Sequence, residues 1–149
     1  MTKPPTGAAD IVLVQDDAND AEFVTRTLSQ VVPDNKVLFI RDGADFLEYL
    51  FGVGKFAGRN INVLPKVILL DLKLPRVNGI EALQTMKDDP QTRAIPVVIF
   101  TSSREEQDVE MCYSLGASSY VVKPSDRQEY AEVLQRLANY WLKLNEHPR

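Results

Sequence analysis

The chain has 149 residues, of which 44% are hydrophobic and 26% charged, and its formal net charge at pH 7 is −4. This composition suits one compact domain with a hydrophobic core. The net negative charge argues against nucleic acid as a partner, because a phosphate-binding face needs clustered Lys and Arg. A single cysteine, Cys112, excludes an internal disulfide and favours a reducing, cytoplasmic location. No apolar run approaches the ~20 residues that span a bilayer, so we expect no membrane partner.

Short apolar runs alternate with helical patterns along the chain. Residues 1–10 contain two prolines and a glycine and are predicted to form a flexible tail before a domain at 11–149. Strands are predicted at 11–14, 37–40, 67–70, 96–100 and 120–122, as short apolar runs buried on both faces. Helical spacing follows each strand, at 21–31, 46–51, 80–86, a stretch ending at 115–116, and 126–144.

Residues 52–66 form a glycine-rich connection that is longer than the usual link from a helix to a strand. Such a loop is either a surface feature with a role of its own or a tolerated insertion. Upstream of it, Asp42 is predicted to cap the second helix.

Strict alternation of strands and helices predicts an α/β fold, a doubly wound parallel sheet with helices on both faces. In such sheets the ligand crevice lies at the carboxyl ends of the strands. Polar side chains occur at these ends, namely Asp16 and Asp17 after the first strand, Asp71 after the third, Thr101 after the fourth and Lys123 after the fifth. The sequence therefore predicts one site at this edge.

This set of residues narrows the chemistry of the site. The one histidine, His147, lies near the end of the chain, which argues against histidine general-base catalysis, and no glycine-rich phosphate loop follows the first strand. Carboxylates at one edge suit Mg²⁺ together with phosphoryl oxygens. What remains is a carboxylate that itself accepts a phosphoryl group, with Mg²⁺, Lys123 and Thr101 compensating its charge.

The spacing of Asp16, Asp71, Thr101, Tyr120 and Lys123-Pro124 resembles the receiver domain of two-component response regulators, over essentially the whole chain. The turn Asp-Leu-Lys-Leu-Pro-x-x-Asn-Gly that starts at Asp71 belongs to the same pattern. The resemblance implies a flavodoxin-like sheet of five parallel strands in the order 2-1-3-4-5, with five helices.

A narrower resemblance is to single-domain regulators paired with phytochrome histidine kinases. It rests on the long loop before the third strand, Asp88-Asp89-Pro90, Ile95-Pro96-Val97-Val98 and the ending at Tyr140-Trp141-Leu142. It implies a phytochrome-type kinase as partner.

The resemblance implies that Asp71 accepts phosphoryl from a kinase phosphohistidine. Such a protein is not a conventional enzyme, although it assists its own phosphorylation and dephosphorylation. Mg²⁺ would be held by Asp16, Asp71 and the backbone carbonyl of Lys73.

The resemblance also implies roles for three further residues. Lys123 would pair with the phosphoryl group, Thr101 would donate its hydroxyl on activation, and Tyr120 would turn inward with it. An ordinary, partly buried aromatic remains the alternative for Tyr120.

Gln15 departs from the family pattern, which has acidic residues at both positions of the pair after the first strand. Gln15 keeps an acceptor oxygen for a metal-bound water but removes one negative charge. We expect weaker Mg²⁺ affinity, with Gln15 and Asp17 as possible outer-shell groups, although capping of the first helix also explains Asp17. The alternative is a pseudo-receiver, an interaction module that is not phosphorylated.

A flavin-binding enzyme with the same sheet order is a further alternative. It would need a hydroxyl-rich loop after the first strand, and Gln15-Asp16-Asp17 would repel a flavin phosphate.

The last predicted helix carries an apolar arc of roughly 200° at 100° per residue, wider than the ~100° that contact with a sheet requires. We therefore predict a homodimer through this helix and the fifth strand. The predicted dimer residues are Val133, Leu137, Tyr140, Trp141 and Leu144. Coverage by the N-terminal tail or the long loop is the alternative. No effector domain is expected after the fifth unit, so the output is predicted to be a protein contact.

Overall fold

The computed structural model describes residues 9–147, and for residues 18–20 the backbone alone. Five parallel strands form one sheet in the order β2-β1-β3-β4-β5, which confirms the predicted order and fold class. The strands are β1 (Ile11–Val14), β2 (Val37–Ile40), β3 (Val67–Leu70), β4 (Val97–Thr101) and β5 (Ser119–Val122). The helices are α1 (Ala18–Leu28), α2 (Gly43–Phe51), α3 (Gly79–Asp88), α4 (Glu106–Ser114) and α5 (Arg127–Asn139).

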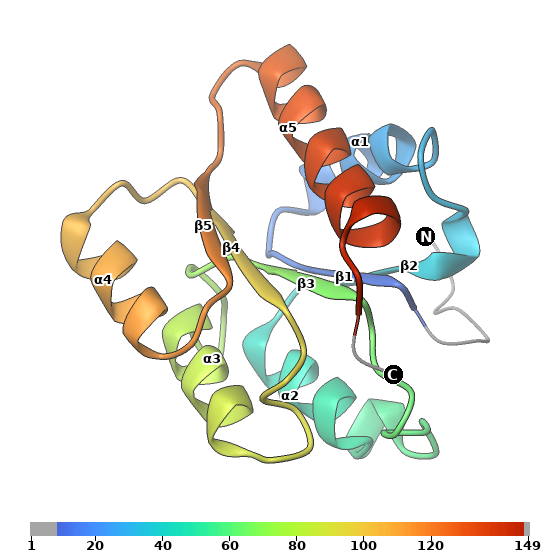
Figure 1. Ribbon diagram of the computed structural model, residues 1–149, viewed down its shortest axis with the longest axis vertical. Coiled ribbons are helices and arrows are strands. Elements are labelled where there is room, and N and C mark those ends of the chain that lie inside the picture. Colours follow the sequence, from blue (N-terminus) through green and yellow to red (C-terminus); the bar gives the residue numbers. More distant parts are fainter. Residues whose placement is uncertain (1–8, 148–149) are drawn as a thin grey trace.

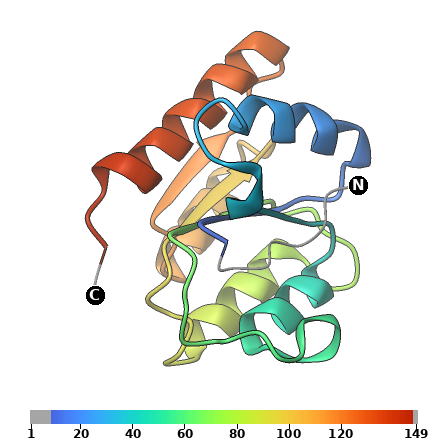
Figure 2. The ribbon, with the colours of Figure 1, turned by 90° about the vertical axis from the view of Figure 1, so that its right-hand side faces the viewer.

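The helices cover both faces of the sheet. In Figure 1, α1 and α5 lie above the sheet, α2 and α3 lie below it, and α4 lies beside β5 at the left. Figure 2 shows α1 and α5 on one side of the sheet and α2 and α3 on the other. Because side chains alternate along a strand, Val12 and Val14 join the hydrophobic cluster under α2, α3 and α4, whereas Ile11 and Leu13 join the cluster under α1 and α5. The β1 residues therefore serve two separate cores.

The ordered fold includes the last residues of the predicted tail. Ala9 is buried. The backbone N–H of Asp10 donates to the carbonyl of Lys36, and the carbonyl of Asp10 accepts from Lys66 and Val67. Residues 1–8 of the predicted tail lie outside the described residues.

Some elements differ from the sequence-based expectation. Helix α1 begins three residues before position 21, at Ala18, and ends at Leu28 instead of residue 31. Helix α5 ends at Asn139 and continues as a π-helical turn, Tyr140–Leu144. Strand β5, one of the two edge strands, is only partly buried, whereas β2 at the other edge is mostly buried. Among the described residues, no helix has both the length and the apolar character needed to span a membrane.

Arg59 ties the long loop at 52–66 to the end of α2. Its guanidinium donates to the carbonyls of Tyr49 at 2.6 Å, Leu50 at 3.1 Å and Val63 at 3.2 Å. The guanidinium carbon also lies 4.2 Å from the centre of the Tyr49 ring. Arg59 thus adds hydrogen bonds to carbonyls at the C-terminus of α2, of which that of Tyr49 also accepts from the Gly52 N–H. The loop is held against this end of the helix.

Candidate functional site

Asp71 and Lys123 meet at the carboxyl edge of the sheet. Asp71 directly follows β3 and Lys123 directly follows β5, and the Lys123 Nζ lies 2.7 Å from Asp71 Oδ2. Their side chains are 13% and 15% exposed, respectively. The other carboxylate oxygen, Oδ1, accepts a longer hydrogen bond of 3.3 Å from the backbone N–H of Lys73. The parallel sheet therefore places a largely enclosed carboxylate against a lysine 52 residues away.

Thr101, the last residue of β4, lies between these two strand ends. Its carbonyl accepts a hydrogen bond of 2.8 Å from the backbone N–H of Lys123. The Thr101 side chain is fully buried, and its hydroxyl has no hydrogen-bond partner among the described residues. A buried hydroxyl without a partner is unusual and costs free energy. This hydroxyl is free to donate to an acceptor that enters the site.

Tyr120 is held at two atoms. Its hydroxyl donates to the carbonyl of Ser103 in the β4–α4 loop at 3.0 Å, and its backbone N–H donates to the Tyr113 hydroxyl of α4 at 3.1 Å. Burial is the main cause that raises the pKa of Tyr120 above its ordinary value, although the hydrogen bond to Ser103 lowers it. The hydroxyl therefore stays protonated and holds the β4–α4 loop.

The three residues after β1 lie in different environments. Asp16 is exposed, as is Asp17. Gln15 is 3% exposed, and its Oε1 lies 3.4 Å from the hydroxyl of Tyr130 in α5, which donates to it. The Gln15 amide nitrogen has no partner among the described residues. Strand alternation thus turns Gln15 toward α5, and its role beside a metal ion stays a prediction.

The loop from Asp71 to α3 folds back on itself. The N–H of Gly79 donates to the Leu72 carbonyl at 2.9 Å, and a Cβ at Gly79 would overlap the Asp71 carbonyl oxygen. Asn78 caps α3 by accepting from the backbone N–H of Glu81 at 2.9 Å. The predicted Asn78-Gly79 turn therefore places the first turn of α3 directly against the backbone of Asp71.

The donor atoms at this edge suit a hard cation. Among residues 9–147, no group of three or more His, Cys, Asp or Glu side chains is placed to hold a metal ion. The predicted set needs only the carboxylates of Asp16 and Asp71 and the carbonyl of Lys73, and Mg²⁺ commonly takes one or two carboxylates and keeps several waters. The residues present therefore fit Mg²⁺.

The predicted dimer residues differ in exposure. Tyr140 is 47% exposed and Leu144 is 74% exposed, so the apolar surplus predicted for the last helix does reach the surface there. Val133, Leu137 and Trp141 are partly buried and pack against the core under α1 and α5.

Comparison with known proteins decides the family. The family model of the response regulator receiver domain matches residues 11–135. The chain belongs to this family. Receiver domains are the signal-receiving parts of two-component systems and act with histidine kinases, so the general resemblance inferred from the sequence is confirmed.

Three similar proteins are named for signalling roles. The response regulator Rcp1 of Synechocystis is 32% identical in sequence, over 89% of this chain and 88% of its own. The Mn²⁺-bound crystal structure of Rcp1 gives a TM-score of 0.85, over 93% of this chain and 98% of the Rcp1 chain. The phosphorylated cyanobacterial phytochrome response regulator RcpA is 29% identical, with a TM-score of 0.87 over 96% of this chain and 100% of its own. The bacteriophytochrome response regulator RtBRR is 44% identical, with a TM-score of 0.72 over 95% of this chain and 85% of its own.

Proposed function

We propose that this receiver domain is a phosphorylation-dependent switch whose acceptor is Asp71. The observation that carries the proposal is the enclosed Asp71–Lys123 ion pair beside the Thr101 hydroxyl, which has no partner in the described part of the chain. A carboxylate oxygen of Asp71 would attack the phosphorus of a kinase phosphohistidine, the P–N bond would break, and its electron pair would return to the imidazole. The product is an aspartyl phosphate.

The neighbouring residues would then compensate the new charge. Lys123 already lies at Asp71 and would form a charge-assisted hydrogen bond to a phosphoryl oxygen. Thr101 would donate its hydroxyl, which has no other partner among the described residues. Movement of Thr101 would open room for Tyr120, whose release from the Ser103 carbonyl would free the β4–α4 loop. The protein would thereby assist its own phosphorylation without being a conventional enzyme.

Mg²⁺ would be held by Asp16, Asp71 and the carbonyl of Lys73. When bound, it supplies positive charge for the phosphoryl oxygens, which would otherwise face the Asp71 carboxylate unshielded. The Mn²⁺-bound structure of the similar regulator Rcp1 supports a divalent ion.

A pseudo-receiver is the second candidate, and Gln15 is the observation that favours it. An amide in this position removes one negative charge next to Asp16, and the structure engages that amide with Tyr130. Such a module would keep the surfaces of the fold without accepting phosphoryl.

Phosphoryl labelling separates the two candidates. The chain is incubated with acetyl phosphate or phosphoramidate at several Mg²⁺ concentrations, and intact mass is measured. We expect one added phosphoryl group in the native chain and in Asp10→Asn, a matched control at the opposite end of the strands, and none in Asp71→Asn. Absence of added mass in the native chain at high millimolar Mg²⁺ would refute the phosphoacceptor function.

The proposed kinase partner is a phytochrome-type histidine kinase in the cytoplasm. Support comes from the names of RcpA and RtBRR, which are phytochrome and bacteriophytochrome response regulators. We expect faster phosphotransfer from a phytochrome-type kinase than from an unrelated histidine kinase of equal phosphohistidine content. Equal rates would refute the pairing but leave the acceptor role of Asp71 intact.

We also propose a homodimer of single-domain chains through the end of α5 and the neighbouring β5. Support comes from the exposed side chains of Tyr140 and Leu144. Light scattering at about 50 μM, a concentration that reveals micromolar dimers, is expected to give twice the chain mass. Leu144→Glu should give a monomer, whereas the control Val53→Glu, at a residue that is 52% exposed in the 52–66 loop, should not. A monomeric native chain, unchanged by a phosphoryl analogue, would count against the dimer.

A further inference from the structure

The loop that carries Lys73 contains an unfavourable backbone conformation. Among residues 9–147, Arg76 is the one non-glycine residue with a positive φ, at 64°. An L-residue in this region has its Cβ close to the backbone, which is energetically unfavourable. Such a conformation persists only where surrounding contacts enforce it.

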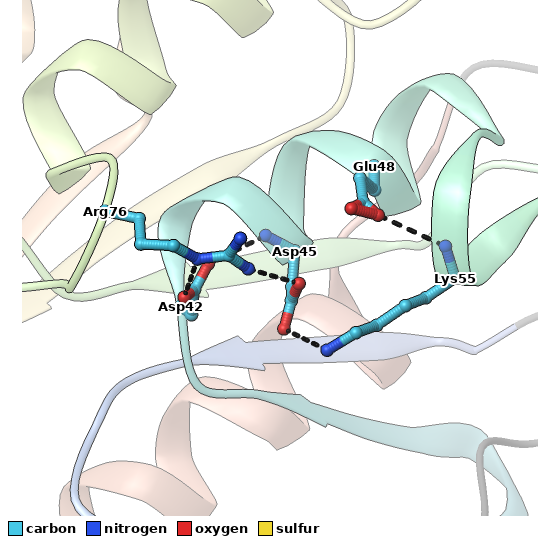
Figure 3. A network of polar contacts seen from close by, with 5 residues as sticks. All are labelled: Asp42, Asp45, Glu48, Lys55 and Arg76. Carbon is cyan, nitrogen blue, oxygen red and sulfur yellow. Dashed lines mark hydrogen bonds and ion pairs between the residues drawn. The ribbon is translucent and has the colours of Figure 1, made fainter.

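Those contacts come from the first turn of α2, as Figure 3 shows. The Arg76 Nε donates to Asp42 Oδ2 at 2.6 Å, and its Nη2 donates to Asp45 Oδ1 at 2.7 Å. The backbone adds a third contact, because the N–H of Gly43 donates to the Pro75 carbonyl at 3.2 Å. The guanidinium thus bridges two carboxylates that lie more than 30 residues away in sequence.

Both carboxylates are fixed by contacts of their own. Asp42 caps α2, with its Oδ1 accepting from the Asp45 N–H at 2.9 Å, and the Asp45 Oδ2 accepts from Lys55 Nζ at 3.0 Å. The Asp42 and Asp45 side chains are only 15% and 17% exposed. Arg76 is therefore anchored to a rigid helix end and not to mobile surface side chains.

We propose that Arg76 is a positioning residue for the metal site: its two ion pairs with α2 hold the Asp71–Val77 loop so that the Lys73 carbonyl is ready to bind the cation. The inference rests on the proposed function, because it needs a divalent ion at Asp71. Only two residues separate Lys73 from Arg76, so the loop between them has little freedom once Asp71 and Arg76 are both held.

Exposed ion pairs are usually weak, and the Arg76 side chain is 56% exposed. Two features of Arg76 argue for a larger effect. It serves two partly buried carboxylates, and without it Asp42 would lose its cationic partner while Asp45 would keep Lys55 alone. It also offsets the backbone cost of a positive φ. The main consequence of its removal is a loosened loop, which weakens ion binding because the loop must be ordered again on binding.

A variant series separates the side chain from the backbone. Arg76→Gly removes the ion pairs and also relieves the strain of the positive φ, because glycine adopts this conformation readily. Arg76→Ala removes the ion pairs but leaves a strained residue at the positive φ. Arg76→Lys keeps the positive charge but cannot donate to both carboxylates as the guanidinium does. Arg93→Ala is the matched control, because Arg93 is exposed at the opposite edge of the sheet and its loss changes the net charge equally. Mg²⁺ affinity is measured by calorimetry, hydrogen exchange of residues 72–77 is measured without metal, and urea unfolding reports folding of each variant.

We expect Arg76→Gly and Arg76→Ala to bind Mg²⁺ about threefold to tenfold more weakly, with faster exchange at 72–77. Arg76→Lys should be intermediate, and Arg93→Ala should match the native chain. If Arg76→Gly bound Mg²⁺ and exchanged its 72–77 amides as the native chain does, the inference would be overturned. The ion pairs of Arg76 would then not be needed to hold the loop once the strain at φ is relieved. An equal loss in Arg93→Ala would also overturn it, because net charge alone would explain the change.

If the proposed metal site is wrong, the Mg²⁺ titration of the native chain gives a different result. In that case the native chain itself shows no binding heat with Mg²⁺, and both the metal site and this inference are refuted. If the native chain binds Mg²⁺ and the Arg76 variants bind equally well, only the inference fails.

Discussion

Replacement of Thr101 by valine should stabilise the unphosphorylated protein. The Thr101 side chain is fully buried and its hydroxyl has no partner among the described residues. Such a hydroxyl costs about 1–3 kcal/mol of desolvation without a compensating hydrogen bond. Valine has nearly the same shape and removes that cost, so we expect the free energy of unfolding to rise by about 1 kcal/mol. Thr101→Ala should lie below Thr101→Val by about 2–3 kcal/mol, because alanine lacks both γ-methyl groups of valine and leaves a cavity in their place.

Urea unfolding without Mg²⁺ measures this difference, with equal m-values as the check that the denatured states match. A phosphoryl analogue such as beryllofluoride, added with Mg²⁺, should stabilise the native chain more than Thr101→Val, because only the native hydroxyl can donate to the analogue. A Thr101→Val protein less stable than the native chain would refute the reasoning, since the hydroxyl would then have a partner. Equal stabilisation of both proteins by the analogue would refute the proposed role in switching.

Other substitutions test the surrounding contacts. Lys123→Met leaves the Asp71 carboxylate, with its side chain 13% exposed, without its ion-pair partner. The free energy of unfolding should fall by about 1–3 kcal/mol in urea, and Asp71→Asn in the same chain should restore part of it. The hydrogen bond from Arg76 holds the pKa of Asp42 below its ordinary value of 3.8. The ion pair therefore contributes its full stability above pH 3.8 and loses it as the pH falls through the lower folded pKa. The native and Arg76→Ala urea midpoints should converge as the pH is lowered from 3.8 through that folded pKa. Burial raises the pKa of the Cys112 thiol to about 11. Ellman's reagent at about pH 8 should therefore react with this thiol only as fast as the chain unfolds. Rapid reaction of the folded protein would contradict the structure.

The strands and the centre of the site could be predicted from the sequence because both depend on local patterns. Three strands match the predicted ranges, and β4 and β5 differ by one residue at their ends. The parallel sheet then brings Asp71, Thr101 and Lys123 to one edge. Residues that directly follow strands are thus located as soon as the topology is known.

The remaining contacts depend on geometry that the sequence pattern does not encode. Gln15 meets Tyr130 across 115 positions, and the approach of Arg76 to α2 requires a positive φ that arginine rarely adopts. The π-helical turn that ends α5 keeps a helical apolar spacing, so the pattern predicts an unbroken helix there. Neither Tyr113 nor Ser103 carries a motif that would predict its contact with Tyr120.

The contact between Tyr113 and Tyr120 also governs how another chain can meet the sheet. Strand β5 is an edge strand, and edge strands offer unpaired backbone groups to which a foreign strand can add. Here the phenol of Tyr113 accepts the N–H of Tyr120 and takes up one of those groups. A second copy that approached β5 would therefore meet side chains instead of extending the sheet. Tyr113 therefore disfavours edge-to-edge pairing at β5, one of the two edges of the sheet, while leaving the apolar surface of the protein available.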